Sequence, residues 1–391
     1  MLGHIYFILM FIFLLYFCNS TIKIKNNSDN DSNNNSYNIY SNVKQTTKIL
    51  VLIPAYNEEK IIKETIKKIY EANYPKELIS VAVIADRCSD NTINLSKSEG
   101  AYVISDLINK NKNKGGIIES FFIKYKNMIK KYDMICFIDA DTFVEKNFFN
   151  AVDYEYKNGI EVVQGKIIIS NNDKNIMSSF NIILQSFINN YFFKILSIEK
   201  KSVLLAGKGF CISSRILSEI DIRTKSLIED VELSFKLLLG NNHIHYCEDM
   251  KVFCLQPNNY VDSFMQQRRW ISGQLDICKI FFLKIFKCNF IFSGVILFTN
   301  VCYINIIAAI SILFFIYKSY FLLFGLYYII AYVCSYISSK IDKNISYLSF
   351  KSYAVFPFIF IFWLLIYIFC IVRPEKNWKP INHYQQLDLL N

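Results

Sequence analysis

Three short apolar runs in the first half of the chain each stop abruptly at proline or aspartate, and this pattern restricts the fold more than any other feature. The runs and their stops are residues 49–53 before Pro54, residues 80–85 before Asp86, and residues 134–138 before Asp139. Such continuous runs are typical of strands buried on both faces of a parallel sheet. Ligands of such sheets bind beyond the carboxyl ends of the strands. We therefore expect polar groups to converge at one edge of a sheet.

Helical spacing follows the first run. Ile61, Ile62, Thr65, Ile66 and Ile69 recur at intervals of three and four, with Lys and Glu between them. This spacing indicates an amphipathic helix. Strands alternating with helices predict an α/β fold with a doubly wound, mostly parallel sheet.

Asp139 and Asp141 are two carboxylates separated by one residue at the end of a strand. Placed there, they can reach one hard cation together, such as Mg²⁺ or Mn²⁺, which also takes phosphate oxygens of a substrate as ligands. Acidic pairs are also common in turns. The buried strand directly before this pair favours the metal site.

Glu229 and Asp230 stand at the start of a helical pattern. Acidic residues in a first helical turn favour the helix dipole, which is one interpretation. The other is a general base that removes a proton from an acceptor hydroxyl. Spacing alone does not decide between them.

Gln266, Arg269 and Trp270 are spaced so that they share one face of a helix. An amide, a guanidinium and an indole together suit a diphosphate and a flat sugar ring. The alternative is an interfacial helix, with Arg and Trp at lipid headgroups.

Taken in order, the motifs resemble those of family 2 glycosyltransferases of the membrane-bound branch, which includes cellulose, hyaluronan and poly-N-acetylglucosamine synthases. The likeness is greatest to exopolysaccharide-type transferases, and it covers about residues 48–275 and the late apolar windows. Its motifs are residues 51–58, 83–92, 114–116, 137–141, 206–211, 229–230 and 266–270. The chain departs from the family pattern at Ile228, where Thr is usual, and at Lys208, where a small or polar residue is usual.

The resemblance implies a GT-A-like nucleotide-diphospho-sugar transferase and inverting transfer of a hexosyl or N-acetylhexosaminyl group, with a UDP-sugar as the expected donor. It implies that Asp230 is the catalytic base and that Asp141, helped by Asp139, holds Mg²⁺ or Mn²⁺. The implied donor-binding residues are Pro54, Ala55, Tyr56, Glu58, Asp86, Lys114, Asp139 and Arg269, and the implied acceptor-binding residues are Glu229, Gln266 and Trp270.

Four windows carry no Lys, Arg, Asp or Glu: residues 1–21, 289–317, 319–339 and 352–372. A bilayer span needs about 20 apolar residues, so the late windows predict transmembrane helices, with buried core helices as the alternative. The first window predicts an uncleaved anchor rather than a cleaved signal peptide, because no basic residue precedes it. Lys23 and Lys25 after it place the catalytic domain in the cytoplasm.

The composition agrees with an integral membrane protein, since 53% of residues are apolar and 19% are charged. A disordered regulator is excluded, because such chains are poor in apolar residues. The net charge of +10 does not indicate a nucleic-acid partner, because the basic residues gather near the windows, where anionic lipid accounts for them.

The predicted organisation divides the chain into six parts. They are a membrane anchor at 1–22, a flexible Asn/Ser-rich linker at 23–47, a catalytic domain at 48–259, interfacial helices at 260–288, three transmembrane helices at 289–373 and a tail at 374–391.

The expected partners are a nucleotide-sugar donor, a glycan or lipid-linked acceptor, the lipid bilayer, and export or co-synthase subunits. Two other functions stay open. One is a polyprenyl-phosphate sugar transferase that makes a single transfer, and the other is a non-catalytic membrane scaffold.

Overall fold

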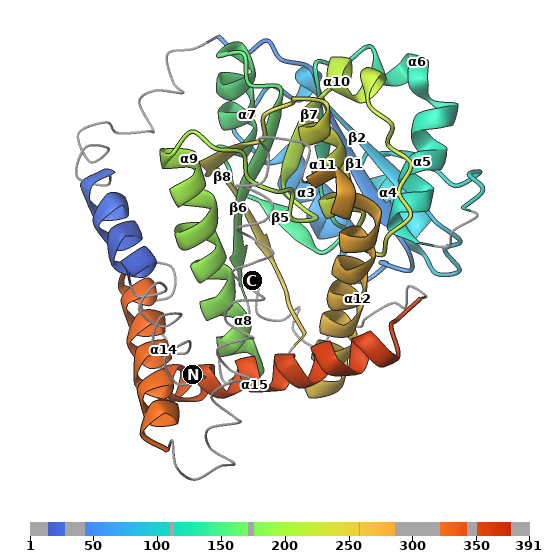
Figure 1. The fold of residues 1–391 in the computed structure, drawn as a ribbon. Helices are drawn as coiled ribbons and strands as arrows, with labels where there is room; N and C mark the ends of the chain where they lie inside the picture. Colours follow the sequence, from blue (N-terminus) through green and yellow to red (C-terminus); the bar gives the residue numbers. More distant parts are fainter. Residues whose placement is uncertain are drawn as a thin grey trace.

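The computed structural model describes residues 15–27, 44–109, 113–170, 176–257, 259–285, 321–341 and 350–376, and the structural statements below concern these residues. A β-sheet lies at the centre of residues 44–257, and helices pack on both of its faces (Figure 1). Pro54, Asp86 and Asp139 lie at or just beyond the carboxyl ends of three of its strands.

Within the described residues, the sheet has the strand order β3-β2-β1-β4-β7-β6-β8-β5. The strands are β1 (Ile49–Ala55), β2 (Ile79–Ala85), β3 (Tyr102–Ile104), β4 (Met134–Phe137), β5 (Thr142–Val144), β6 (Val162–Ile169), β7 (Phe210–Ser213) and β8 (His245–Cys254). The three apolar runs of the sequence correspond to β1, β2 and β4.

The sheet is mixed but mostly parallel, as expected, since β6 also pairs in parallel with β8. β1 pairs in parallel with β2 and β4, and β2 pairs in parallel with β3. β7 runs antiparallel to both β4 and β6, and the edge strand β5 runs antiparallel to β8. β7 is reversed because the chain enters it beside the carboxyl end of β4, where Gly209 N donates to Phe137 O at 2.9 Å.

The uninterrupted apolar sequence of β1 contributes side chains to the hydrophobic cores on both faces of the sheet. Ile49, Val51 and Ile53 belong to the cluster on one face of the sheet, and Leu50 and Leu52 belong to the cluster on the other face. All five side chains are fully buried. A central strand covered on both faces cannot alternate apolar and polar residues, which is why the run is continuous.

Helices separate most of the strands along the chain. They are α3 (Ile62–Tyr70), α4 (Thr92–Ser98), α5 (Lys114–Lys124), α6 (Lys126–Ile129), α7 (Phe148–Lys157), α8 (Ile176–Phe187), α9 (Ile195–Ile198), α10 (Ser214–Glu219), α11 (Glu229–Leu239), α12 (Tyr260–Ile285), α14 (Phe321–Ile341) and α15 (Phe350–Val372), with the short segments η1 (Lys76–Leu78) and η2 (Ile188–Lys194). In α3, the residues that are buried are those that the spacing predicted, Ile62, Thr65, Ile66 and Ile69.

In the part of the chain that the structure describes, no helix has both the length and the apolar character that crossing a bilayer requires. This finding contradicts the predicted transmembrane helices and the predicted location as an integral membrane protein. Residues 1–14 and the window at 289–317 lie outside the described residues.

Part of the apolar sequence of α15 packs against the protein itself, whereas Leu365, Ile368, Ile371 and Val372 are exposed. Trp363, Ile366 and Cys370 are buried in a cluster that also contains residues of β1. The Trp363 ring packs edge-on against Phe180 of α8, and the Tyr367 hydroxyl donates to Gln274 of α12 at 2.7 Å. In Figure 1, α15 runs along the bottom of the molecule below α8 and α12. At these positions the apolar residues serve helix packing, which was the alternative interpretation of the window.

The first described helix, residues 15–27, packs on α8 and η2. Phe17 stacks on Tyr191 with ring centres 4.6 Å apart, and Lys23 pairs with Glu199 at 2.5 Å. The helix therefore extends into the segment predicted as a linker from residue 23. Residues 28–43 of that linker lie outside the described residues.

Candidate functional site

A cavity of about 510 Å³ lies beyond the carboxyl ends of β1, β2 and β4. The structure brings every site residue expected from the sequence to the wall of this one cavity. These residues are Pro54, Ala55, Tyr56, Glu58, Asp86, Lys114, Asp139, Asp141, Glu229, Asp230, Gln266, Arg269 and Trp270. Their individual roles remain predictions, and the geometry below shows what each is able to contact.

Asp86, at the end of β2, is held by two neighbours. It is 7% exposed, accepts hydrogen bonds from the Arg87 guanidinium at 2.9 and 2.8 Å, and accepts one from Asn109 Nδ2 at 2.8 Å. The Arg87 guanidinium also lies 5.4 Å from the centre of the Tyr56 ring. Sequence reasoning did not identify Arg87 or Asn109 as part of the site. The available signal for Arg87 was its position directly after Asp86.

The loop after β1 and the loop after β2 are joined by hydrogen bonds. Ser89 N donates to Asn57 Oδ1 at 2.8 Å, and Glu58 N donates to Thr92 Oγ1 at 2.8 Å. The two loops therefore form one wall of the cavity, and Asn57 is a structural member of it that sequence reasoning did not single out.

Lys114 connects three of the motifs. Its Nζ lies 2.6 Å from Asp139 Oδ1 and 3.5 Å from Glu229 Oε1, and it donates to Gly207 O at 2.7 Å. Lys114 begins α5, which Asn113 caps by accepting from Gly116 N at 2.8 Å. One ammonium group thus holds together the strand end, the glycine turn and the start of α11.

Lys208 lies between the two aspartates of the proposed metal motif. Its Nζ is 3.5 Å from Asp139 Oδ2 and 3.4 Å from Asp141 Oδ1, and its side chain is 14% exposed. Sequence reasoning recorded Lys208 only as a departure from the family pattern. Its contact with both aspartates could not be foreseen, because Lys208 is about 70 positions from them in the chain and meets them only through the pairing of β4 with β7.

Two glycines allow these elements to approach one another. A Cβ atom at Gly115 would lie 2.2 Å from Thr224 Oγ1, so a larger residue there would push α5 away from the loop before α11. Gly207 has a φ of +79°, and a Cβ atom there would lie 3.2 Å from Asp230 Oδ2. The carboxylate of Asp230 therefore packs directly against the backbone of the glycine turn.

Asp139 and Asp230 have pKa values that are shifted in opposite directions. Burial, with a further contribution from Glu229, raises the pKa of Asp230 from 3.8 to about 7. Burial acts on Asp139 in the same direction, but the charges of Lys114, Lys208 and Arg269 outweigh it and lower the pKa of Asp139 below its usual value. Asp139 is therefore ionised at neutral pH, whereas Asp230 can exchange a proton there.

Helix α12 presents different groups on its two sides. Gln266, Arg269 and Trp270 line the cavity, as their shared helical face predicted. Arg269 Nε is buried and has no hydrogen-bond partner among the described residues. The neighbouring Arg268 also has a buried Nε with no partner among the described residues, and its guanidinium pairs with Glu375 at 3.1 Å. Arg269 brings a guanidinium charge to the wall of the cavity.

The residues of the cavity fit a divalent cation only in part. Asp139 and Asp141 supply hard oxygen ligands. Among the described residues, no group of three or more His, Cys, Asp or Glu side chains is arranged to hold a metal ion. A cation such as Mg²⁺ or Mn²⁺ fits this set when phosphate oxygens and water complete its coordination, which is how Mg²⁺ usually binds at such sites.

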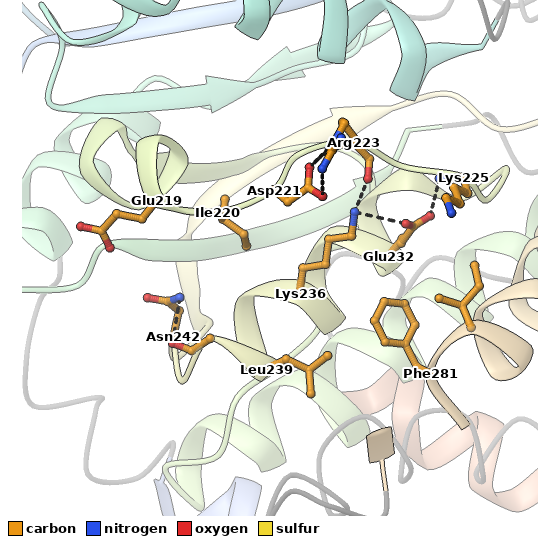
Figure 2. Close-up of a pocket in the computed structure, with 12 residues that line it drawn as sticks. Glu219, Ile220, Asp221, Arg223, Lys225, Glu232, Lys236, Leu239, Asn242 and Phe281 are labelled. Atoms are coloured by element: carbon orange, nitrogen blue, oxygen red, sulfur yellow. Dashed lines mark hydrogen bonds and ion pairs between the residues drawn. The ribbon is translucent and has the colours of Figure 1, made fainter. Parts of the chain in front are cut away.

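A second cavity, of about 690 Å³, lies on the other side of α11 (Figure 2). Lys236 reaches Glu232 at 3.3 Å and the backbone carbonyl of Arg223, and Arg223 pairs with Asp221 at 2.7 Å. Four of the charged residues of this cavity, Asp221, Arg223, Glu232 and Lys236, are thus engaged with one another, and none of the predicted site residues lines it.

Known proteins share both the sequence pattern and the fold. The family profile described as "Glycosyl transferase family group 2" matches residues 134–371, which is more than half of the chain. The chain is 26% identical over 259 residues to the probable glycosyltransferase YdaM of Bacillus subtilis, a match that covers 63% of this chain and 60% of that protein. It is 25% identical over 245 residues to the poly-beta-1,6-N-acetyl-D-glucosamine synthase of Staphylococcus aureus, covering 59% of this chain and 56% of that protein. The matches thus span less than two thirds of the length of these relatives.

Among solved structures, the fold is similar to that of the mannosyltransferase PcManGT from Pyrobaculum calidifontis, which was solved in complex with GDP-Man and Mn²⁺. The TM-score is 0.58 at 12% sequence identity, and the alignment covers 95% of this chain and 99% of that chain. This likeness shows a shared GT-A-like fold with a mixed sheet.

Proposed function

The chain belongs to glycosyl transferase family group 2, and on that premise we propose that it transfers a sugar, with inversion, from a UDP-sugar to a hydroxyl of a glycan or lipid-linked acceptor. The observation that carries this proposal is the Lys114 bridge between Asp139 and Glu229. Within one cavity, it links Asp139, which we expect beside the diphosphate, to Glu229, which precedes the expected base. The relatives named above support a role in exopolysaccharide synthesis.

The wall formed by the loops after β1 and β2 binds the nucleoside. Asp86 accepts an N–H of the base, and Arg87 keeps its carboxylate oriented through two hydrogen bonds. Tyr56 offers an aromatic face to the same region of the cavity.

The opposite wall binds the diphosphate. Lys114 and Arg269 bring two positive charges to it, and a guanidinium group is suited to phosphate oxygens. Asp139 and Asp141 hold Mg²⁺ or Mn²⁺, which when bound adds charge that stabilises the leaving diphosphate.

Asp230 is the general base. Its carboxylate accepts the proton of the acceptor hydroxyl while that oxygen bonds to the anomeric carbon, and the bond from that carbon to the diphosphate breaks. A pKa of about 7 suits this task, because the group is largely ionised just above neutral pH and still basic enough to take the proton. One displacement inverts the anomeric centre.

Glu229, Gln266 and Trp270 bind the acceptor. Trp270 lies on the face of α12 that borders α11, close to the base, and its indole suits the flat side of a sugar ring. Glu229 is anchored by Lys114 at 3.5 Å, so its second oxygen is available to an acceptor hydroxyl.

The test is a transfer assay on the purified full chain. A panel of UDP- and GDP-sugars is incubated with Mn²⁺ or Mg²⁺ and with oligosaccharide and polyprenyl-phosphate acceptors, and products are identified by mass. We expect turnover with a UDP-sugar. A single added sugar on the lipid acceptor would instead establish a single-transfer enzyme, and the absence of both donor turnover and nucleotide binding would reject the proposal.

A further inference from the structure

Lys208 is fixed in place by the fold and is not a mobile surface lysine. Its backbone lies between two glycines with positive φ, Gly207 at +79° and Gly209 at +66°. The buried side chain of Gln164 clamps this turn, since it accepts from Ala206 N at 2.8 Å and donates to Lys208 O at 3.1 Å. The ammonium group is therefore directed at the aspartates by a rigid turn.

The electrostatics of the aspartate pair depend on this lysine. Asp139 has a second cation within reach, because Lys114 lies 2.6 Å away. Asp141 does not: among the described residues its ion-pair partner is Lys208 alone. Without Lys208, the carboxylate of Asp141, whose side chain is 13% exposed, would be a nearly buried charge with no counter-ion.

Two lysines thus already neutralise the two carboxylates that are suited to a divalent cation. A dication that enters this set meets the ammonium of Lys208 within the space where its own carboxylate contacts must form. Like charges at such distances in a partly buried site repel strongly. Contacts of Lys208 with the carboxylates of Asp139 and Asp141 therefore weaken the binding of the cation to the same carboxylates, and the reverse is also true.

We propose that Lys208 is a resident counter-cation of Asp139 and Asp141 that competes with the divalent metal for the same carboxylates. The free protein consequently binds the metal weakly. When a nucleotide diphosphate is present, which rests on the function proposed above, the displaced ammonium gains phosphate oxygens as new partners. Metal and nucleotide then bind cooperatively, and Lys208 supplies part of the coupling between them.

The test measures Mn²⁺ binding by electron paramagnetic resonance in the full chain, without nucleotide and with UDP. Lys208→Met removes the charge and keeps most of the side-chain volume, and Lys208→Arg keeps the charge. Lys236→Met is the matched control, because Lys236 is also a mostly buried lysine that pairs with a carboxylate, but in the second cavity.

Without nucleotide, we expect Lys208→Met to bind Mn²⁺ about tenfold more tightly than the wild type. Lys208→Arg and Lys236→Met should stay close to the wild type. UDP should increase Mn²⁺ affinity in the wild type by a larger factor than in Lys208→Met. An unchanged or weaker Mn²⁺ affinity in folded Lys208→Met would overturn the proposal.

These outcomes separate the inference from the proposed function. If UDP alters Mn²⁺ affinity in no variant, donor binding has failed, while the comparison without nucleotide still decides the role of Lys208. If Lys208→Met does not fold, acetylation of wild-type lysines is followed by mass spectrometry. Mn²⁺ should increase the reactivity of Lys208 and leave that of Lys236 unchanged, and a Lys208 that does not respond would contradict displacement.

Discussion

Helix α11 borders two cavities that differ in how their charged residues are paired. Glu229 and Asp230, in its first turn, line the smaller cavity, and Glu232 and Lys236 line the larger one. In the larger cavity the ion pairs are local: the partners stand two or four residues apart. In the smaller cavity they join distant parts of the chain, since Lys114 contacts both Asp139 and Glu229.

The larger cavity is therefore not the one that gathers the predicted site residues. The larger cavity has charges that stabilise their own segment, and the smaller one has charges that different motifs share. The predictions below test this distinction by removing one charge at a time from each side of α11.

The largest effect should come from Asp230→Asn in the smaller cavity. The amide cannot accept the proton of the acceptor hydroxyl, so we expect the transfer rate to fall by about a thousandfold. UDP binding, measured by calorimetry, should stay within a few-fold of the wild type because Asp86 and Lys114 are untouched. Asp221→Asn in the larger cavity is the control and should transfer normally. Full turnover by Asp230→Asn would remove this residue from the base role.

Asp141→Ala should have the next largest effect, through the metal. We expect Mn²⁺-dependent binding of the nucleotide to weaken by about a hundredfold, because one of two carboxylate ligands is lost. Titration of nucleotide at fixed Mn²⁺ measures it. Asp262→Ala, at the exposed start of α12, should leave binding unchanged. Equal activity with and without divalent cations in the wild type would reject the metal site itself.

Glu232→Ala should act on stability rather than chemistry. Glu232 is 2% exposed, accepts from Lys225 N and Ser226 N at 2.7 and 2.8 Å, and pairs with Lys236. Its removal takes the carboxylate away from two backbone N–H groups and from the Lys236 ammonium. The free energy of unfolding, measured in urea, should therefore fall by about 2–4 kcal/mol. The double variant with Lys236→Met should lose less than the sum of the single variants. A simple sum would show that the pair is not coupled.

The smallest effect concerns pH. Because the pKa of Asp230 is raised from 3.8 to about 7, the folded state keeps a proton that the unfolded state releases, and stability falls as pH rises through this interval. Asp230→Asn should therefore be more stable than the wild type at pH 8 and equal to it below pH 3.8. The transfer rate of the wild type should change in the opposite direction, rising through about pH 7. A flat profile of both quantities would contradict the shifted pKa.

The sequence predicted the parts of the site that depend on strand ends. A buried strand that stops at an acidic residue determines where that residue lies, so the order of apolar and acidic residues was enough to assign Asp86 and Asp139 to one edge of the sheet. The shared face of α12 could be predicted equally well, because spacing alone places Gln266, Arg269 and Trp270 on one side of a helix, and all three line the cavity.

The remaining features depend on contacts between distant segments. The reversed direction of β7 brings Lys208 beside Asp141, and no local pattern encodes that pairing. The apolar window at 352–372 was misread for a related reason. Hydropathy reports that α15 is apolar but not what covers it, and the described Trp363 and Ile366 are covered by the protein's own core.

One further consequence follows from the two neighbouring arginines of α12. Consecutive residues of a helix point about 100° apart, so Arg268 and Arg269 turn together. Arg269 faces the cavity, while Arg268 pairs with Glu375 and donates to Arg373 O at 3.2 Å. Any rotation of α12 that withdrew Arg269 would also break the contacts with the segment after α15. The last described residues of the chain therefore help to set the angle at which α12 presents the Arg269 guanidinium group to the cavity.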